Sequence, residues 1–397
     1  MSRPPAPATQ PGPAASDTHP ALTDRALAEL RREFPILHTH TYLNSCSLGA
    51  LSTRAEQRLG HFLELWHTMG ASAWYEHWLG RLQELREQVE GLLGAAPGSV
   101  GLSPSTSVAI SSFVESLDFD SRPRVVIADL DFPTLGHQFQ VKPEVELVVV
   151  RSQDGVGVDP EQFREVVDER TALVATSHVF YATGFRQDLA ALGRIAREAG
   201  ALSLVDGYQG AGQVDVDVSA AGIDAYTTGP LKWLLGGPGL SYLWVRPELI
   251  SRLEPRITSW FAAEDQFDFG LEDFRFRPDA RRFEMGTPAL PTVHTALGGQ
   301  ELLLEVGMAA VEARNRFLTR HVEAGLEARG FRLRQARDPA ERTAIVMVEH
   351  ENAPDAVARL AREGIVVDHR PGCVRVSPHV YNTLEEMDRF VEALPES

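Results

Sequence analysis

The chain has 397 residues, of which 43% are hydrophobic, and a formal net charge of −17. This length allows two domains with a large core, and the negative charge argues against nucleic acid or an anionic membrane as partner, because both bind basic surfaces. The two cysteines cannot form a disulfide framework, and no apolar run is long enough to cross a membrane.

Residues 1–22 are rich in Pro and Ala and lack the apolar centre of a signal peptide, so we expect a disordered tail and a cytoplasmic protein. An N-terminal segment follows over residues 23–52, with a short amphipathic helix at its start and a stretch around Asn44 that ends at Gly49. His38 and His40 lack companion ligands at the spacing of a zinc site, and no metal is expected.

A large domain is expected over residues 53–291, and it opens with helical apolar spacing at 54–68 and 79–93. Ser105, Thr106 and Ser107 then stand at the start of another apolar helix pattern. Hydroxyl residues are common helix caps, but a helix N-terminus beside hydroxyl groups also suits a phosphate dianion.

Strands are predicted at residues 124–128, 146–150 and 172–176, with a helix at about 160–168 before the third. Phe132 follows the first strand in Asp-Phe-Pro-Thr, and His178 and Tyr181 follow the third. His178 is either a satisfied core histidine or a proton-transfer group. A helix at 187–199 completes a βαβ unit.

The central prediction comes from Asp206 and Lys232. Residues 201–205 read as a buried parallel strand, which places Asp206 at the carboxyl end where open α/β sheets bind ligands. The only lysines are Lys142, which we interpret as a solvated surface charge, and Lys232, which lies among Gly, Pro, Trp and Leu. Desolvation there would lower the pKa of the amine, and a lysine can form a Schiff base where an arginine cannot. A strand-end acid followed by such a lysine suggests pyridoxal phosphate.

Beyond a strand at 240–245, Trp260 lies in Ser-Trp-Phe and Thr287 in Gly-Thr-Pro. A smaller α+β domain is expected over residues 292–397, with strands at 341–350, 365–369 and 374–377 and helices at 353–363 and 383–394. Its last strands carry Arg370 and Arg375 in Arg-Pro-Gly-Cys-Val-Arg-Val-Ser-Pro, with Tyr-Asn following.

Taken together, these motifs resemble the class V aminotransferase superfamily, which includes cysteine desulfurases, isopenicillin N epimerase-like proteins and kynureninases. The most specific pair of motifs is Asp206-Gly-Tyr-Gln followed by Gly-x-x-Lys232-Trp-Leu. The kynureninase branch is favoured by His178-Val-x-Tyr-x-Thr-Gly. The resemblance implies an α/β protein of fold type I, with a mostly parallel sheet in the large domain and a homodimer with a shared active site.

The resemblance also implies roles for individual residues. Lys232 carries the cofactor, Asp206 keeps its pyridine nitrogen protonated, and Arg375 binds the substrate carboxylate. Arg370 is either a second anchor or an ordinary ion-pair partner, and we favour the ion-pair partner. The other cofactor contacts implied are Ser105, Thr106, Ser107, Phe132 (stacked on the ring), Tyr181, Gln209, Thr228 and Thr287 (reaching the phosphate of the neighbouring subunit). Trp260 and Asn44 are expected on the substrate side, and His178 is an open candidate for catalysis.

The function expected first is a kynureninase-like lyase that cleaves the side chain of an amino acid. An aminotransferase or epimerase on a small amino acid, and a pyridoxal phosphate protein without catalysis, are the alternatives. Gly207-Tyr208-Gln209 departs from the kynureninase pattern towards desulfurases and epimerases, but Cys373 lies only two residues before Arg375 and suits the mobile nucleophile of a desulfurase poorly. A Gly-x-Gly-x-x-Gly dinucleotide motif and a Gly-x-Ser-x-Gly nucleophile elbow are both absent.

Overall fold

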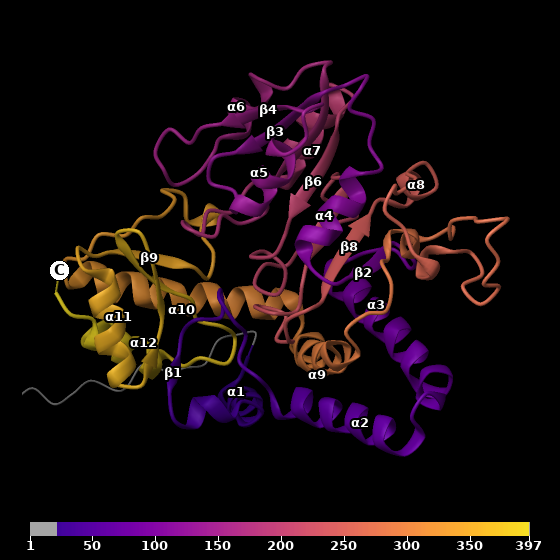
Figure 1. Ribbon diagram of the computed structural model, residues 1–397. Coiled ribbons are helices and arrows are strands. Elements are labelled where there is room, and N and C mark those ends of the chain that lie inside the picture. Colours follow the sequence, from indigo (N-terminus) through magenta and orange to yellow (C-terminus); the bar gives the residue numbers. More distant parts are fainter. Residues whose placement is uncertain (1–21, 397) are drawn as a thin grey trace, which may run out of the picture.

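A computed structural model describes residues 22–396 (Figure 1). The tail predicted for residues 1–22 lies outside the described residues except for Leu22. In the described part of the chain, no helix combines the length and the apolar character needed to cross a membrane.

A seven-stranded sheet forms the centre of the described residues, with strand order β2-β8-β7-β6-β5-β3-β4. Strands β3 to β7 run parallel to one another, whereas β8 is antiparallel to both β7 and β2. The mostly parallel sheet of the predicted α/β fold is therefore confirmed. Its strands are β2 (Val100–Ser103), β3 (Arg124–Ala128), β4 (Glu146–Val150), β5 (Thr171–Ser177), β6 (Leu202–Asp206), β7 (Ala225–Thr228) and β8 (Ser241–Val245).

Both faces of this sheet are buried, because alternate residues of its strands enter two different apolar clusters. On β6, for example, Val205 joins one cluster and Leu204 the other. The helices of this part are α2 (Thr53–Met69), α3 (Leu79–Leu93), α4 (Thr106–Val114), α5 (Pro133–Gln140), α6 (Pro160–Arg164), α7 (Leu189–Glu198) and α8 (Pro247–Ile250). A π-helical turn, Trp74–Trp78, joins α2 to α3, and α3 ends at Gly94, the predicted stop, whose φ of 62° is left-handed.

Two long helices, α9 (Leu290–Val306) and α10 (Met308–Ala328), lead into the smaller part (Figure 1). The predicted boundary at 291/292 falls at the start of α9, which packs against α2 and α3. The smaller part consists of β9 (Val346–Glu349), α11 (Ala353–Arg362), β10 (Ile365–Val366), β11 (Asp368–Arg370), β12 (Cys373–Val376) and α12 (Leu384–Ala393). Within the described residues, β11, β12 and β9 form an antiparallel three-stranded sheet.

Two strand predictions in this part need correction. The strand expected at 341–350 is confined to β9, because Thr343 donates to Gly184 O (2.8 Å) and the N–H of Ala344 donates to Gln213 Oε1 (2.8 Å) instead of joining the sheet. The strand expected at 365–369 is divided into β10 and β11, because the two pieces pair with different partners.

The N-terminal segment packs on the small C-terminal part, as Figure 1 shows for α1 (Asp24–Arg32) and β1 (Thr41–Tyr42). Strand β1 pairs in parallel with β10, so that Thr41 lies opposite Ile365. Arg31 of α1 forms an ion pair with Glu386 (2.9 Å) and donates to Tyr381 O (2.7 Å). The two ends of the described chain therefore form one structural unit.

Candidate active site

A cavity of about 300 Å³ lies at the carboxyl ends of the central strands and collects most of the predicted cofactor residues. Strand β5 ends at Ser177 and β6 at Asp206, both of which line it. Its lining consists of Pro104, Ser105, Thr106, Ser107, Phe132, Thr134, Ser177, Val179, Tyr181, Asp206, Tyr208, Gln209, Leu231, Lys232, Pro238, Gly239 and Leu240. The structure thus brings together residues that lie far apart in the sequence.

Asp206 is a buried acid in this wall, with 8% of its surface exposed. Its Oδ1 accepts a hydrogen bond from the N–H of Tyr208 at 2.9 Å. Burial raises the pKa of the carboxyl group, while the Tyr208 N–H and the positive charge of Lys232 act in the opposite direction. A cation or a protonated ring nitrogen in the cavity would compensate for this desolvation.

Lys232 lies on the turn after β7, and its Nζ lies 4.9 Å from the centroid of the Tyr208 ring. Burial lowers the pKa of the amine to about 8, although Cys46 and Asp206 partly oppose this shift. The amine is therefore deprotonated near physiological pH far more readily than a solvated lysine. Lys142 forms an ion pair with Glu115 and is 18% exposed, so the predicted surface lysine is paired and largely covered instead of freely solvated.

The turn that carries Lys232 is held by the N-terminal segment. The N–H of Gly49 donates to Leu231 O at 2.9 Å. A Cβ atom added at Gly49 would lie 2.2 Å from Lys232 O, closer than any real contact, so this position requires glycine.

The start of α4 forms another wall of the cavity. Ser105 is the N-cap, and its hydroxyl accepts a hydrogen bond from the N–H of Val108 at 3.3 Å. The hydroxyl of Thr106 lies 3.4 Å from that of Ser241. The capping interpretation is thus confirmed for Ser105, and the same helix N-terminus also lines the cavity, where it suits a phosphate.

Phe132 and Tyr181 form an edge-to-face aromatic pair with ring centroids 5.2 Å apart. Phe132 is 46% exposed at the cavity and is positioned by its neighbour Asp131. The carboxylate of Asp131 accepts from the N–H groups of Ala128 (2.8 Å) and Ser177 (2.7 Å), and burial raises its pKa to about 7. Asp131 therefore ties the turn after β3 to the end of β5, a role that the sequence did not indicate.

Gln209 lines the cavity, but both ends of its amide are engaged elsewhere. Its Nε2 donates to Cys46 O (2.9 Å), and its Oε1 accepts from the indole N–H of Trp233 (2.8 Å). Asn44 is outside the lining residues and pairs through its backbone with Ser377. Gln209 thus links the cavity wall to the N-terminal segment.

Four further predicted residues lie outside the cavity lining: His178, Thr228, Trp260 and Thr287. The ring of His178 is buried, its Nδ1 lies 3.1 Å from the hydroxyl of Tyr226, and burial lowers its pKa to about 3. This geometry agrees with the first of the two alternatives for His178, a histidine of the protein core. Thr228 donates to Gly207 O at 3.3 Å, while Trp260 and Thr287 are exposed on the long connection between α8 and α9.

Arg375 lies directly behind the cavity wall and is 1% exposed. Its Nη1 donates to Tyr181 O (3.0 Å), and its Nη2 donates to Ser47 Oγ (2.7 Å) and Asp368 Oδ2 (2.8 Å). Its Nε has no hydrogen-bond partner among the described residues. Arg370 forms an ion pair with Asp368 at 2.8 Å, which confirms its interpretation as an ion-pair partner.

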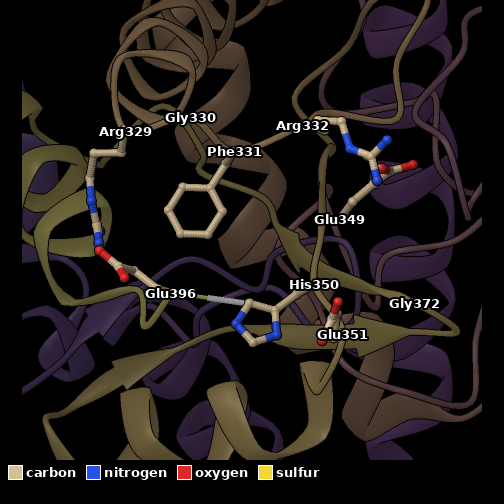
Figure 2. A pocket seen from close by; sticks show the side chains of 9 residues that line it. All are labelled: Arg329, Gly330, Phe331, Arg332, Glu349, His350, Glu351, Gly372 and Glu396. Atoms are coloured by element: carbon tan, nitrogen blue, oxygen red, sulfur yellow. Dashed lines mark ion pairs between the residues drawn. The ribbon is translucent and has the colours of Figure 1, made fainter.

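A second hollow of about 490 Å³ lies on the small part and is lined by residues around His350 (Figure 2). Three of its charged groups are engaged: Arg332 pairs with Glu349 at 3.2 Å, and Arg329 donates to Leu394 O at 2.9 Å. It contains none of the predicted site residues. The candidate active site is therefore the cavity at Asp206 and Lys232.

The chemistry of this cavity fits pyridoxal phosphate: a buried acid for the pyridine nitrogen, a desolvated lysine for the aldehyde, an aromatic face, and a helix N-terminus with hydroxyl groups for the phosphate. Fold and site together define a pyridoxal phosphate-dependent enzyme of fold type I. The profile of the family described as aminotransferase class-V matches residues 55–390, and the chain belongs to this family.

Known relatives cover nearly the whole chain. The "uncharacterized aminotransferase YcbU" of Bacillus subtilis is 31% identical, over 92% of this chain and 96% of the relative. A kynureninase of Geobacillus thermodenitrificans is 27% identical, over 93% of this chain and 90% of the relative. Among solved structures, the apo form of a cysteine desulfurase from Thermococcus onnurineus NA1 superposes with a TM-score of 0.81 at 20% identity, covering 92% of this chain and 96% of that chain.

Proposed function

We propose that this enzyme cleaves the side chain of an amino acid, in the manner of a kynureninase-like lyase. The observation that carries the proposal is the common cavity of Lys232, Asp206, Phe132 and Tyr181, with Arg375 directly behind Tyr181. The chain is 27% identical to a kynureninase over nearly the full length of both proteins, which supports the same reaction class.

In this mechanism each side chain has a defined task. The bound cofactor supplies an electron sink for the bond that breaks at the amino acid. Arg375 would bind the α-carboxylate, and its Nε, which has no hydrogen-bond partner among the described residues, is the free donor. Asp206 keeps a proton on the pyridine nitrogen, and the neutral amine of Lys232 removes the α-proton. Phe132 would cover one face of the cofactor ring.

His178 receives a positioning role in this proposal. With a pKa of about 3 its imidazole stays neutral, and its hydrogen bond to Tyr226 fixes the wall behind Asp206. We propose the remaining predicted contacts, Thr228, Gln209 and Asn44, as supports of the same wall.

The cysteines argue against a desulfurase reaction for this chain. Cys46 and Cys373 are both 0% exposed, and burial raises the pKa of the Cys373 thiol. A persulfide-forming cysteine must reach the substrate, and the complete burial of both side chains argues against such a role.

The reaction type is tested with a panel of amino acids that includes kynurenine. A lyase should release anthranilate and alanine from kynurenine, or a cleaved side chain from another amino acid, without any 2-oxo acid. Turnover that requires a 2-oxo acid and leaves the cofactor in its amine form would establish the aminotransferase alternative instead. Racemised amino acid would indicate an epimerase. A change of the cofactor spectrum without any product would indicate a protein that binds the cofactor without catalysis.

We also propose a homodimer. The connection between α8 and α9 projects from the body of the molecule (Figure 1) and exposes apolar side chains, among them Phe269 at 72% and Leu271 at 96%. Exposed apolar side chains that gather on one segment often mark a protein–protein interface, and we propose that the exposed Thr287 on the same connection reaches a second subunit. Sedimentation should give twice the chain mass, and Phe269→Asp should shift the equilibrium towards the monomer. A wild-type chain that sediments as a monomer would refute this proposal.

A further inference from the structure

One carboxylate, that of Asp368, joins two guanidinium groups beside the active site. Its Oδ2 accepts hydrogen bonds from Arg375 Nη2 (2.8 Å), Arg370 Nη1 (2.8 Å) and Ser47 Oγ (2.9 Å). Its Oδ1 accepts from the N–H of His369 (2.7 Å). Asp368 and Arg375 lie opposite each other on the hairpin of β11 and β12, so the backbone itself fixes their approach.

This cluster adjoins the cavity through Tyr181. Arg375 donates to Tyr181 O, and the guanidinium of Arg370 lies over the Tyr181 ring at 5.9 Å from its centroid. Both arginine charges contribute to the lowered pKa of Lys232, which places them within electrostatic range of the reacting amine. A substrate held at Lys232 therefore experiences the field of the whole cluster.

The net charge of the cluster is one positive charge: two arginines and one aspartate. Burial alone would raise the pKa of Asp368, but the hydrogen bond from the His369 N–H and the charge of Arg375 hold it at about 2, so the carboxylate is ionised at neutral pH. Among the described residues that line the cavity, only Asp206 and Lys232 carry a charge, and the proposed function assigns both to the cofactor. The cluster thus contributes one net positive charge beside the cavity, which suits a single α-carboxylate.

We propose that Asp368 is a specificity-determining residue that disfavours amino acids with a carboxylate in the side chain. This inference rests on the proposed function. Asp368 accepts from Nη2 of Arg375 and from Nη1 of Arg370, so its negative charge offsets one of the two guanidinium charges that a second carboxylate on the substrate would otherwise meet. That carboxylate would also meet the negative charge of Asp368 itself, and like charges at close range repel.

The experiment compares isosteric amino acids that differ in one charge: L-aspartate with L-asparagine, and L-glutamate with L-glutamine. Their dissociation constants are measured on the holoenzyme by titration of the cofactor absorbance. In the wild type the amides should bind more tightly. Asp368→Asn raises the cluster charge to two and should shift the acid-to-amide preference towards the acids by roughly tenfold, as expected for unit charges several ångströms apart in a partly solvated site.

Two further variants separate charge from structure. Arg370→Gln lowers the cluster charge to zero and should shift the preference in the opposite direction. The double variant Asp368→Asn with Arg370→Gln restores one positive charge and should restore the wild-type preference. Ser47→Ala removes a partner of Arg375 without changing any charge, and it should weaken the acid and the amide equally.

The outcomes distinguish this inference from the proposed function. If no amino acid changes the cofactor spectrum of the wild type, the proposed function and this inference are both refuted. If the wild type binds amino acids but the preference does not follow the cluster charge through the variants, only this inference is refuted. Melting temperatures identify variants that fail to fold, and in that event the shift in Arg370→Gln alone decides.

Discussion

The lowered pKa of Lys232 gives a prediction about how the apoenzyme takes up its cofactor. Burial moves the pKa of this amine from 10.5 to about 8, a change that corresponds to about 3 kcal/mol in favour of the neutral form. Covalent attachment of the cofactor requires the neutral amine. Uptake should therefore rise with pH through a midpoint near 8. At pH 8 about half of the Lys232 amines are neutral, against roughly 0.3% for an amine of pKa 10.5, so attachment should be about a hundredfold faster than to a solvated lysine.

The assay follows the absorbance of the cofactor after apoenzyme is mixed with pyridoxal phosphate between pH 6 and 10. Lys232→Ala is the matched control, because Lys142 remains in that variant and any slow absorbance change must come from it or from other amines. A midpoint near 10.5, or equal rates in the variant and the wild type, would refute the reasoning.

The lowered pKa of Lys232 also affects the stability of the apoenzyme. Because the pKa of this amine in the folded chain lies below its value in the unfolded chain, the unfolded chain binds more protons between pH 8 and 10.5. The stability contributed by this group therefore rises with pH across that window, and below pH 8 the apoenzyme bears the full cost of about 3 kcal/mol.

Three other predictions follow from the same residues and their supports. Asp206→Asn should lower turnover on the order of a hundredfold, since preorganised electrostatic contacts contribute ~3 kcal/mol, and near-normal turnover would rule out its role at the pyridine nitrogen. Borohydride reduction of the holoenzyme and peptide mapping should place the pyridoxyl label on Lys232, and a label elsewhere would remove it from the mechanism. Gly49→Ala should destabilise the protein by about 1–3 kcal/mol through its clash with the Lys232 turn and should speed loss of cofactor on dialysis. An unchanged melting temperature would show that this turn is free to move.

The sequence predicted the parts of the site that depend on local pattern. Strand β6 reads as a buried run, so its last residue, Asp206, could be placed at the carboxyl end of a parallel sheet. The chain has only two lysines, and the apolar neighbours of Lys232 indicated that it is the chemically active one. Both residues line the cavity at the predicted edge of the sheet, because the geometry of parallel strands brings their carboxyl ends to one edge.

The parts that the sequence did not predict depend on contacts between distant segments. The ring of His178 turns into the core towards Tyr226, and nothing in the local pattern indicates which side of the strand end it occupies. The sequence pattern predicts only a strand at Asp368, whereas in the folded chain its carboxylate accepts a hydrogen bond from Ser47, near the other end of the chain. Long-range pairs of this kind leave no periodicity in the sequence, and only the folded chain reveals them.

The pairing of β1 with β10 has a consequence for how the protein is made. Thr41 leaves the ribosome early, but its partner Ile365 emerges only after nearly the whole chain has been translated, on the order of tens of seconds later at usual elongation rates. During that interval Gly49 and its neighbours have no small domain to dock on, and the turn that carries Lys232 lacks one of its supports. We expect the large domain to attach its cofactor only after the complete chain has been released from the ribosome. Translation would then determine when the enzyme becomes active.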